Sequence, residues 1–375
     1  MWAYFNPVKV KFGVDAFHRL SDQIAGRAYG LVTYPDAPFR ILSDALVEEA
    51  GAPVAVISDV APNPDFKLLK DQCATFDSNN GRPEVIVALG GGSVIDSAKV
   101  FASADGDFSR VQRFLETGKG DDELGNIPVI AVPTTAGTGS EVTCWATVWD
   151  EDNARKYSLA RASLYPEAAI IDPRLMVGKP IGLTVSTGLD ALSHALESIW
   201  NINANPVSAC CAVKAARTLL QDLPRLLRDP VNLDLRSNVA EASLFAGLAF
   251  SNTKTAIAHN LSYPVTLGWG VQHGIACSFT LPAILRSMAG CGGFREASLA
   301  EIFGDDLEAG SERLKSFLAG LGVGHRFADH GVPDSAFLNI VDEAFAGERG
   351  KNFAGSKERF LEAAAWFEIA SPSAA

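Results

Sequence analysis

The feature that most constrains the fold is an alternation, through the first half of the chain, between short apolar runs and helical patterns. The runs are rich in Val, Ile and Ala and have the length of buried strands. Helical stretches such as 39–50 and 64–73 separate them, which is typical of crossover connections in a parallel sheet. The expected strands cover residues 28–33, 53–58, 84–89, 128–132 and 168–172.

The character of the sequence changes after Pro180, where apolar residues recur at helical spacing and no convincing strand pattern appears. A chain of 375 residues is also too long for one ordinary hydrophobic core. We therefore predict an α/β, Rossmann-like parallel-sheet domain over residues 1–178 and an all-α domain over residues 179–375. The expected helices of the second domain cover residues 187–200, 206–220, 235–250, 297–302, 310–321 and 356–369.

Composition excludes several classes of partner. The net charge of −12 argues against nucleic acid or an anionic membrane surface, and an anionic substrate would need a local cluster of Lys or Arg. No apolar run has the length of a membrane span, and residues 1–7 lack the pattern of a signal peptide. The six cysteines form no CxxC pair, as expected of reduced thiols in a cytosolic enzyme. We expect a cytoplasmic protein with no nucleic-acid or membrane partner.

Glycines follow the strand that is expected to end at Leu89. In the segment 90–99, Gly91 and Gly92 let backbone N–H groups approach a phosphate at the start of the next helix, and Ser93 adds a hydroxyl. The motif alone is weak evidence, since a glycine-rich turn is often only a tight turn, and it is not the usual GxGxxG fingerprint.

A second loop, residues 133–141, follows the next strand in the same way and carries Thr134, Thr135 and Thr138. Two such loops at the carboxyl ends of neighbouring strands form the crevice where open α/β sheets bind ligands. A hydroxyl-rich helix cap explains either loop but explains both poorly. Together the loops predict a bound dinucleotide.

One carboxylate and three imidazoles have a spacing that suits a divalent metal. Asp190 and His194 lie one helical turn apart, and His259 and His273 bracket a segment whose Pro264 and glycines predict turns. Taken alone, the Asp-x3-His pair is more often a surface hydrogen bond. All four residues, together with a cofactor loop upstream, favour zinc or ferrous iron.

These motifs resemble those of the iron-containing (group III) alcohol dehydrogenase family, which shares its fold with glycerol dehydrogenase and dehydroquinate synthase. The resemblance extends over nearly the whole chain. The segments that carry it are 90–99, 133–141, 172–173, 187–197 and 272–274.

The resemblance implies a function for particular residues. It implies that Asp190, His194, His259 and His273 bind the metal, commonly Fe²⁺ and in some members Zn²⁺. Phe250 lies where family members line the substrate pocket, and members are usually homodimers or larger. The positions where members contact NAD or NADP are Gly91, Gly92, Ser93, Asp96, Thr134, Thr135, Thr138 and Lys156.

Two positions depart from the family pattern. Many members have a histidine four residues after the third ligand, where this chain has Tyr263, which either relays a proton or only packs. Members that prefer NAD often end their first long strand with an aspartate, whereas here Tyr34 follows the strand and Asp36 comes two residues later. The choice between NAD and NADP therefore stays open.

The expected reaction is metal-assisted hydride transfer between a nicotinamide and a small alcohol or aldehyde. Lys254 either pairs with an anionic tail of the substrate or is a solvated surface lysine. Residues 251–255, 262–264, 6–9 and 12–13 resemble the subgroup that interconverts 2-hydroxyethylphosphonate and phosphonoacetaldehyde. Alternatives are sulfoacetaldehyde, an uncharged short-chain alcohol, a lyase resembling dehydroquinate synthase, and a metal-free enzyme resembling maleylacetate reductase.

Overall fold

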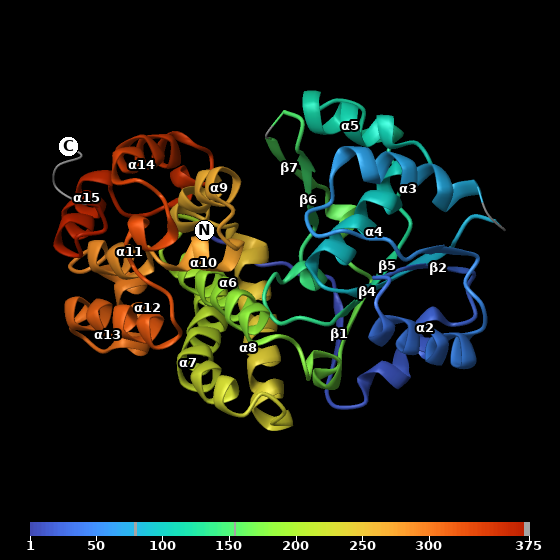
Figure 1. Cartoon of the computed structure of the whole chain (residues 1–375), viewed down its shortest axis with the longest axis horizontal. Coiled ribbons are helices and arrows are strands. Elements are labelled where there is room, and N and C mark those ends of the chain that lie inside the picture. Colours follow the sequence, from blue (N-terminus) through green and yellow to red (C-terminus); the bar gives the residue numbers. More distant parts are fainter. Residues whose placement is uncertain (79–80, 154, 371–375) are drawn as a thin grey trace. The chain divides into compact units, whose positions relative to one another are not determined.

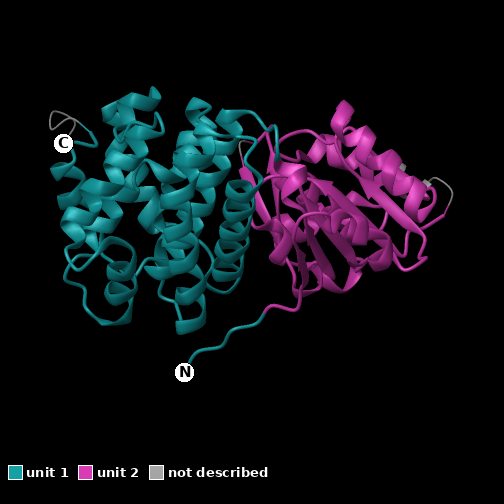
Figure 2. Ribbon diagram, turned by 90° about the horizontal axis from the view of Figure 1, so that it is seen from below, with its two compact units in different colours: residues 1–5, 136–138, 177–375 teal, residues 6–135, 139–176 magenta. Residues whose placement is uncertain are grey.

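Two units of different secondary structure make up the chain (Figure 1, Figure 2). The computed structural model describes residues 1–78, 81–153 and 155–370. The α/β unit comprises Asn6–Thr135 and Gly139–Met176, and the helical unit comprises Met1–Phe5, Ala136–Thr138 and Val177–Ala375.

The α/β unit is built on a six-stranded sheet with the order β1-β8-β5-β4-β2-β3, in which all neighbouring strands are parallel. The fold class predicted from the sequence is confirmed. The strands are β1 (Lys9–Phe12), β2 (Tyr29–Val32), β3 (Ala55–Ile57), β4 (Val85–Gly90), β5 (Val129–Pro133) and β8 (Ala168–Ile171).

Helices cover both faces of this sheet. Successive side chains of a strand point to opposite faces, and in the central strands they enter two different cores. Ile86 and Ala88 of β4 belong to a core that includes Phe101, whereas Val85 and Val87 belong to a second core that includes Leu46. The helices of this unit are α1 (Leu20–Ile24), α2 (Ala37–Ala50), α3 (Phe66–Ser78), α4 (Gly92–Ala104) and α5 (Phe108–Thr117).

The α/β unit also contains strands that the sequence did not predict. β1 is a short edge strand in which three of four residues are exposed, so it lacks the apolar run that identified the others. β6 (Trp145–Asp150) and β7 (Arg155–Ala160) form an antiparallel hairpin outside the main sheet. β7 has one buried residue among six and therefore gives a weak apolar signal.

The buried Lys99 fastens α4 to the chain that leads into this hairpin. Its ammonium group donates hydrogen bonds to the carbonyl oxygens of Ser140, Thr143 and Trp145, at 2.7, 2.8 and 2.9 Å. Burial lowers the pKa of Lys99 to about 8.

The helical unit is organised around α6, which packs against α7, α8 and α10. No strand lies in the described residues 177–370, as the sequence predicted, and no helix in the described chain is long and apolar enough to span a membrane. Its helices are α6 (Ile181–Ile199), α7 (Pro206–Arg228), α8 (Leu233–Thr253), α9 (Ile257–Trp269), α10 (His273–Ser278), α11 (Leu281–Ser287), α12 (Gly293–Phe303), α13 (Leu307–Gly320), α14 (Phe337–Ala346) and α15 (Lys357–Trp366).

Candidate functional site

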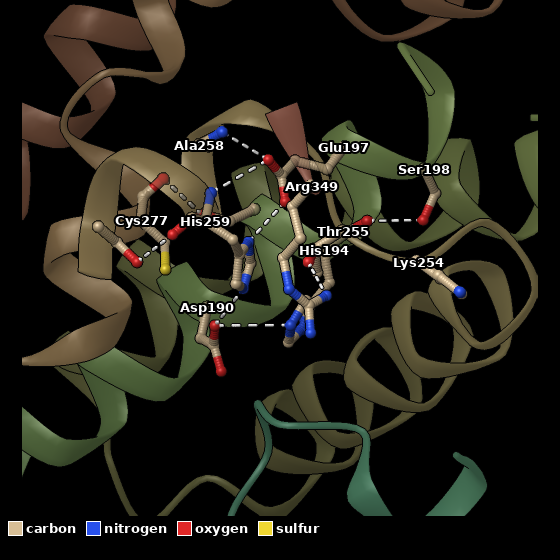
Figure 3. A network of polar contacts seen from close by, with 12 residues as sticks. Asp190, His194, Glu197, Ser198, Lys254, Thr255, Ala258, His259, Cys277 and Arg349 are labelled. Carbon is tan, nitrogen blue, oxygen red and sulfur yellow. Dashed lines mark hydrogen bonds and ion pairs between the residues drawn. The ribbon is translucent and has the colours of Figure 1, made fainter. Parts of the chain in front are cut away.

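Asp190 and His194 lie one turn apart on α6, and both side chains are buried (Figure 3). His194 Nε2 is 3.7 Å from Asp190 Oδ1. A surface hydrogen bond, which is the common meaning of an Asp-x3-His pair, does not describe this arrangement. The pair instead forms part of a polar cluster inside the helical unit.

His259 and His273 reach the same carboxylate oxygen from α9 and α10, with Nε2 atoms 3.4 and 3.9 Å from Asp190 Oδ1. The expected turn at Pro264 is wrong, because this proline lies within α9. The chain reverses after α9, at Gly270, which has a left-handed conformation with φ of 68°.

Gly274 lets α10 approach α6 closely. A Cβ atom at this position would overlap the carbonyl oxygen of Ser186 on α6. Because no side chain intervenes, the N-terminus of α10 lies directly on α6, and His273 at that N-terminus is close to Asp190.

The donor atoms of this cluster fit a divalent metal. Asp190 Oδ1 and His259 Nε2 are buried, and neither has a hydrogen-bond partner in the described residues. Leaving buried polar atoms without a partner costs free energy, which coordination of a cation would recover. A carboxylate with three imidazoles suits Fe²⁺ or Zn²⁺.

Cys277 is a further potential ligand that the sequence reasoning missed. The donor atoms of Asp190, His259, His273 and Cys277 all lie within 4.8 Å of one another. The signal was present in the sequence, since Cys277 follows His273 by one helical turn.

Glu197 orients His259, and this role was also not anticipated. Its Oε2 accepts a hydrogen bond from His259 Nδ1 at 2.5 Å, and its Oε1 accepts one from the backbone N–H of Ala258 at 2.6 Å. With Nδ1 bound in this way, Nε2 faces Asp190. A carboxylate behind a ligating histidine is a common arrangement in metal sites.

The electrostatics of the cluster keep the Asp190 carboxylate ionised and shift the pKa values of the imidazoles in different directions. Burial raises the pKa of Asp190, but the adjacent His194 and the other imidazoles outweigh it and leave the pKa below its ordinary range. Burial lowers the pKa of His194 to about 4, so this imidazole is neutral at pH 7 and available as a ligand. For His259 burial acts in the same direction, but Cys277 and Glu197 outweigh it and raise the pKa well above its usual value.

Of the three expected substrate residues, two have rings beside the imidazoles. Phe250 stacks on His194 with ring centroids 4.0 Å apart, and Tyr263 lies parallel to His273 at 6.3 Å. Lys254 is exposed at the end of α8, and Figure 3 shows its side chain extending away from the imidazoles.

Arg349 is a candidate that sequence reasoning did not identify. Its Nη1 donates a hydrogen bond to Thr255 Oγ1 at 2.5 Å, and Figure 3 shows its side chain extending toward the side of His194. No sequence motif indicates this arginine. It comes after α14, 155 residues beyond His194 in the sequence.

The two glycine-containing loops begin side by side in the α/β unit. Gly90 at the end of β4 is in register with Pro133 at the end of β5, and the Thr134 N–H donates to the Gly90 carbonyl oxygen at 3.0 Å. A Cβ atom at Gly91 would lie 3.2 Å from Thr135 Oγ1. The structure thus brings together the loop positions that were expected to hold a nucleotide.

The remaining cofactor candidates have different surroundings. Gly92 begins α4, and Ser93 Oγ accepts a hydrogen bond from the Asn63 N–H at 3.3 Å. Thr138 lies in the short segment assigned to the helical unit.

Asp96 and Lys156 are associated with the hairpin. Asp96 Oδ2 accepts from the Thr147 N–H at 2.9 Å, and Oδ1 is a buried atom without a hydrogen-bond partner in the described chain. Burial raises the pKa of Asp96, and Lys156 on β7 is among the charges that oppose this. The Lys156 ammonium lies 5.4 Å from the centre of the Trp149 ring.

Comparison with known proteins extends over nearly the whole chain. Residues 7–173 match the model of the iron-containing alcohol dehydrogenases, and residues 184–360 match the model of the C-terminal part of the same family. The 1,3-propanediol dehydrogenase of Klebsiella pneumoniae is 31% identical over 368 residues, 92% of each chain. The NAD-dependent methanol dehydrogenase of Bacillus methanolicus is 31% identical over 308 residues, 80% of each chain.

Solved structures agree with these matches. The sulfoacetaldehyde reductase of Bifidobacterium kashiwanohense, in complex with NAD⁺, superposes with a TM-score of 0.90 at 29% identity and covers 99% of both chains. The sequence led us to expect Fe²⁺ or Zn²⁺ together with NAD or NADP, and iron and NAD are cofactors of this family. From the family models, the relatives and the fold together, the chain belongs to the iron-containing alcohol dehydrogenase family.

Proposed function

We propose that this enzyme interconverts a small anionic aldehyde, such as phosphonoacetaldehyde, with its alcohol, using NAD or NADP and a divalent metal. The observation that supports the metal site is the position of Asp190 Oδ1, which lies within 3.9 Å of the Nε2 atoms of His194, His259 and His273.

In this proposal Asp190, His194, His259 and His273 hold Fe²⁺, with Zn²⁺ as the alternative. A metal bound by these residues would supply Lewis-acid chemistry toward the substrate oxygen. Glu197 keeps His259 in the tautomer whose Nε2 faces the metal position, through the 2.5 Å hydrogen bond to Nδ1. Phe250, stacked on His194, is buried and helps to exclude water from that side of the imidazoles.

The α/β unit is proposed to bind the dinucleotide, and the helical unit to bind metal and substrate. This division corresponds to domains over residues 1–178 and 179–375. The proposed nucleotide contacts are made by backbone and hydroxyl groups at the ends of β4 and β5 and by side chains of α4 and β7. They are Gly91, Gly92, Ser93, Asp96, Thr134, Thr135, Thr138 and Lys156.

The substrate class is supported by the structural likeness to a sulfoacetaldehyde reductase, which acts on a small aldehyde with an anionic group. Phosphonoacetaldehyde has the same two-carbon aldehyde and a different acid group. Lys254 was expected to pair with this acid group, and Tyr263 to line the substrate position. Sulfoacetaldehyde and uncharged short-chain aldehydes are the competing substrates.

We also propose a cytoplasmic homodimer or larger homo-oligomer. All six cysteines are free, as is usual in a reducing compartment. The edge strand β1 exposes Val10 and Phe12, and apolar side chains on an open sheet edge favour pairing with another chain.

The test removes one proposed ligand. In His273→Ala we expect loss of bound metal, measured by elemental analysis of anaerobically purified protein, and loss of NAD(P)H consumption with any aldehyde. The matched control is His18→Ala, which removes an exposed histidine from the α/β unit.

An active, metal-loaded His273→Ala variant would refute the metal site. Net consumption of NAD(P)H by the unmodified enzyme also separates a reductase from a synthase-like lyase, which regenerates its cofactor. Wild-type kcat/KM for phosphonoacetaldehyde, sulfoacetaldehyde and butyraldehyde then ranks the substrates.

A further inference from the structure

The Arg349 guanidinium has hydrogen-bonding capacity that the described part of the chain leaves unused. An arginine offers five N–H donors in a planar fork. In the described residues this side chain makes one hydrogen bond, to Thr255 Oγ1, and no ion pair with a carboxylate. A half-buried guanidinium without an acidic partner is well suited to an anionic ligand.

The same guanidinium is held at a defined place. Thr255 is buried, and its carbonyl oxygen accepts a hydrogen bond from Asn352 Nδ2 at 2.9 Å. Thr255 lies four residues before His259, on the chain that leads into α9. Arg349 is therefore anchored to the segment that positions a proposed metal ligand, and its side chain extends toward the side of His194 (Figure 3).

Lys254 has none of these features, although the sequence makes it the obvious cation. It is exposed, makes no side-chain hydrogen bond or ion pair in the described part of the chain, and extends away from the imidazoles (Figure 3). A flexible, hydrated ammonium binds an oxyanion as a point charge, whereas the guanidinium fork matches two of its oxygens at once.

We infer that Arg349 binds the tetrahedral oxyanion of the substrate, a phosphonate or a sulfonate, and so gives the enzyme its preference for anionic aldehydes. The inference rests on the proposed function. A local cation is needed for such a substrate, because the net charge of −12 repels anions. Thr255 acts as a positioning residue that fixes the orientation of the fork.

The test compares substrates that differ in charge. For wild type, Arg349→Ala, Arg349→Lys and Lys254→Ala, kcat/KM is measured with phosphonoacetaldehyde, sulfoacetaldehyde and butyraldehyde. We expect Arg349→Ala to lower the ratio of anionic to uncharged kcat/KM about 10- to 100-fold, mainly through KM, since a charge-assisted pair is lost. Arg349→Lys should recover only part of it, and added guanidinium ion should restore activity to Arg349→Ala.

The matched control is Lys351→Ala, which removes an exposed positive charge two residues away and should leave the ratio within about twofold of wild type. Equal losses in Lys351→Ala and Arg349→Ala would overturn the inference, because a diffuse field would then suffice. A loss in Lys254→Ala with none in Arg349→Ala would also overturn it. A larger loss with phosphonoacetaldehyde than with sulfoacetaldehyde supports a phosphonate, and the reverse supports a sulfonate.

A binding measurement covers the case in which Arg349→Ala folds poorly. Calorimetric titration of wild type, Arg349→Lys and Arg349→Gln with ethylphosphonate and with ethanesulfonate should show weaker binding in both variants. Unchanged affinity would refute the inference even if the enzyme reduces aldehydes. Failure of wild type to reduce any aldehyde would refute the proposed function instead.

Discussion

Glu141 and Glu197 are both buried carboxylates, but their surroundings act on them in opposite directions. Burial alone raises the pKa of each. Glu197 is compensated by His259 and by backbone N–H groups, so its pKa is lowered and it stays ionised. At Glu141, the last residue of the second glycine-containing loop, burial outweighs its backbone hydrogen bond and the charge of Lys99, and the pKa rises to about 7.

The pKa of Glu141 predicts a pH dependence of stability. A carboxyl group with a pKa of about 7 in the folded chain and about 4.5 when unfolded binds more protons when folded. The contribution of Glu141 to the free energy of unfolding is therefore complete below pH 4.5 and is lost as the pH rises through 7. Relative to Glu141→Gln, the wild-type free energy of unfolding should fall by up to about 3 kcal/mol between pH 5 and 8.

Urea unfolding at pH 5, 6.5 and 8 measures this difference. The control is Glu123→Gln, at a carboxylate that is exposed. Parallel pH profiles for Glu141→Gln and wild type would contradict the assignment of this proton to Glu141.

Single residues also differ in whether the sequence predicts their role. Asp190 and His194 were predictable as a pair because one helical turn separates them. Glu197 lies in the same motif, but its role of orienting His259 depends on the position of α9, which no local sequence pattern predicts. Arg349 was unpredictable for the same reason, since its contact with Thr255 joins segments 94 residues apart.

At the scale of elements, the approach of α10 to α6 places His273 near Asp190. Gly274→Ala would put a methyl group into the carbonyl oxygen of Ser186. Overpacking of this kind costs about 1–3 kcal/mol. We expect a lower melting temperature by calorimetry and a reduced metal content by elemental analysis.

Gly268→Ala is the matched control, because a Cβ atom there would meet nothing within 4 Å and the residue lies within α9. An alanine in a helix is favoured over glycine by about 1 kcal/mol, so this variant should be at least as stable as wild type. Similar metal content in both variants would show that the α10–α6 approach is not required for the site.

Elements with strong apolar periodicity were predicted well, and elements with mixed exposure were not. The strands β2, β3, β4, β5 and β8 match the expected runs, and α2 and α3 match the two expected crossover helices. Between β5 and β8 the chain instead forms the β6–β7 hairpin. β1 and the β6–β7 hairpin escaped prediction because they are short or exposed. Pro264 is a turn signal in the sequence, yet α9 continues through it, since tertiary packing can override a local breaker.

At the scale of the whole molecule, the proposed sites draw on different units. All four proposed metal ligands lie in the helical unit, on α6, α9 and α10. All proposed nucleotide contacts except Thr138 lie in the α/β unit. A ligand stabilises the state to which it binds, so each cofactor should protect mainly its own unit.

Hydrogen exchange with and without a chelator tests this expectation. Removal of the metal should speed amide exchange in α6, α9 and α10 and leave β4 and β5 unchanged within error. The reverse pattern, or equal changes in both units, would contradict the proposed ligand set. Addition of NAD to metal-free protein serves as the control and should slow exchange around β4 and β5.

The loop that follows β5 has a consequence for how the two cofactors affect each other. Thr134 and Thr135 begin it, and the Gly137 carbonyl oxygen accepts from His194 Nδ1 at 3.3 Å. In the proposed function, a nucleotide that fixes this backbone also fixes the support of His194, a proposed metal ligand. By thermodynamic reciprocity, any factor by which iron tightens nucleotide binding is also the factor by which the nucleotide tightens iron binding.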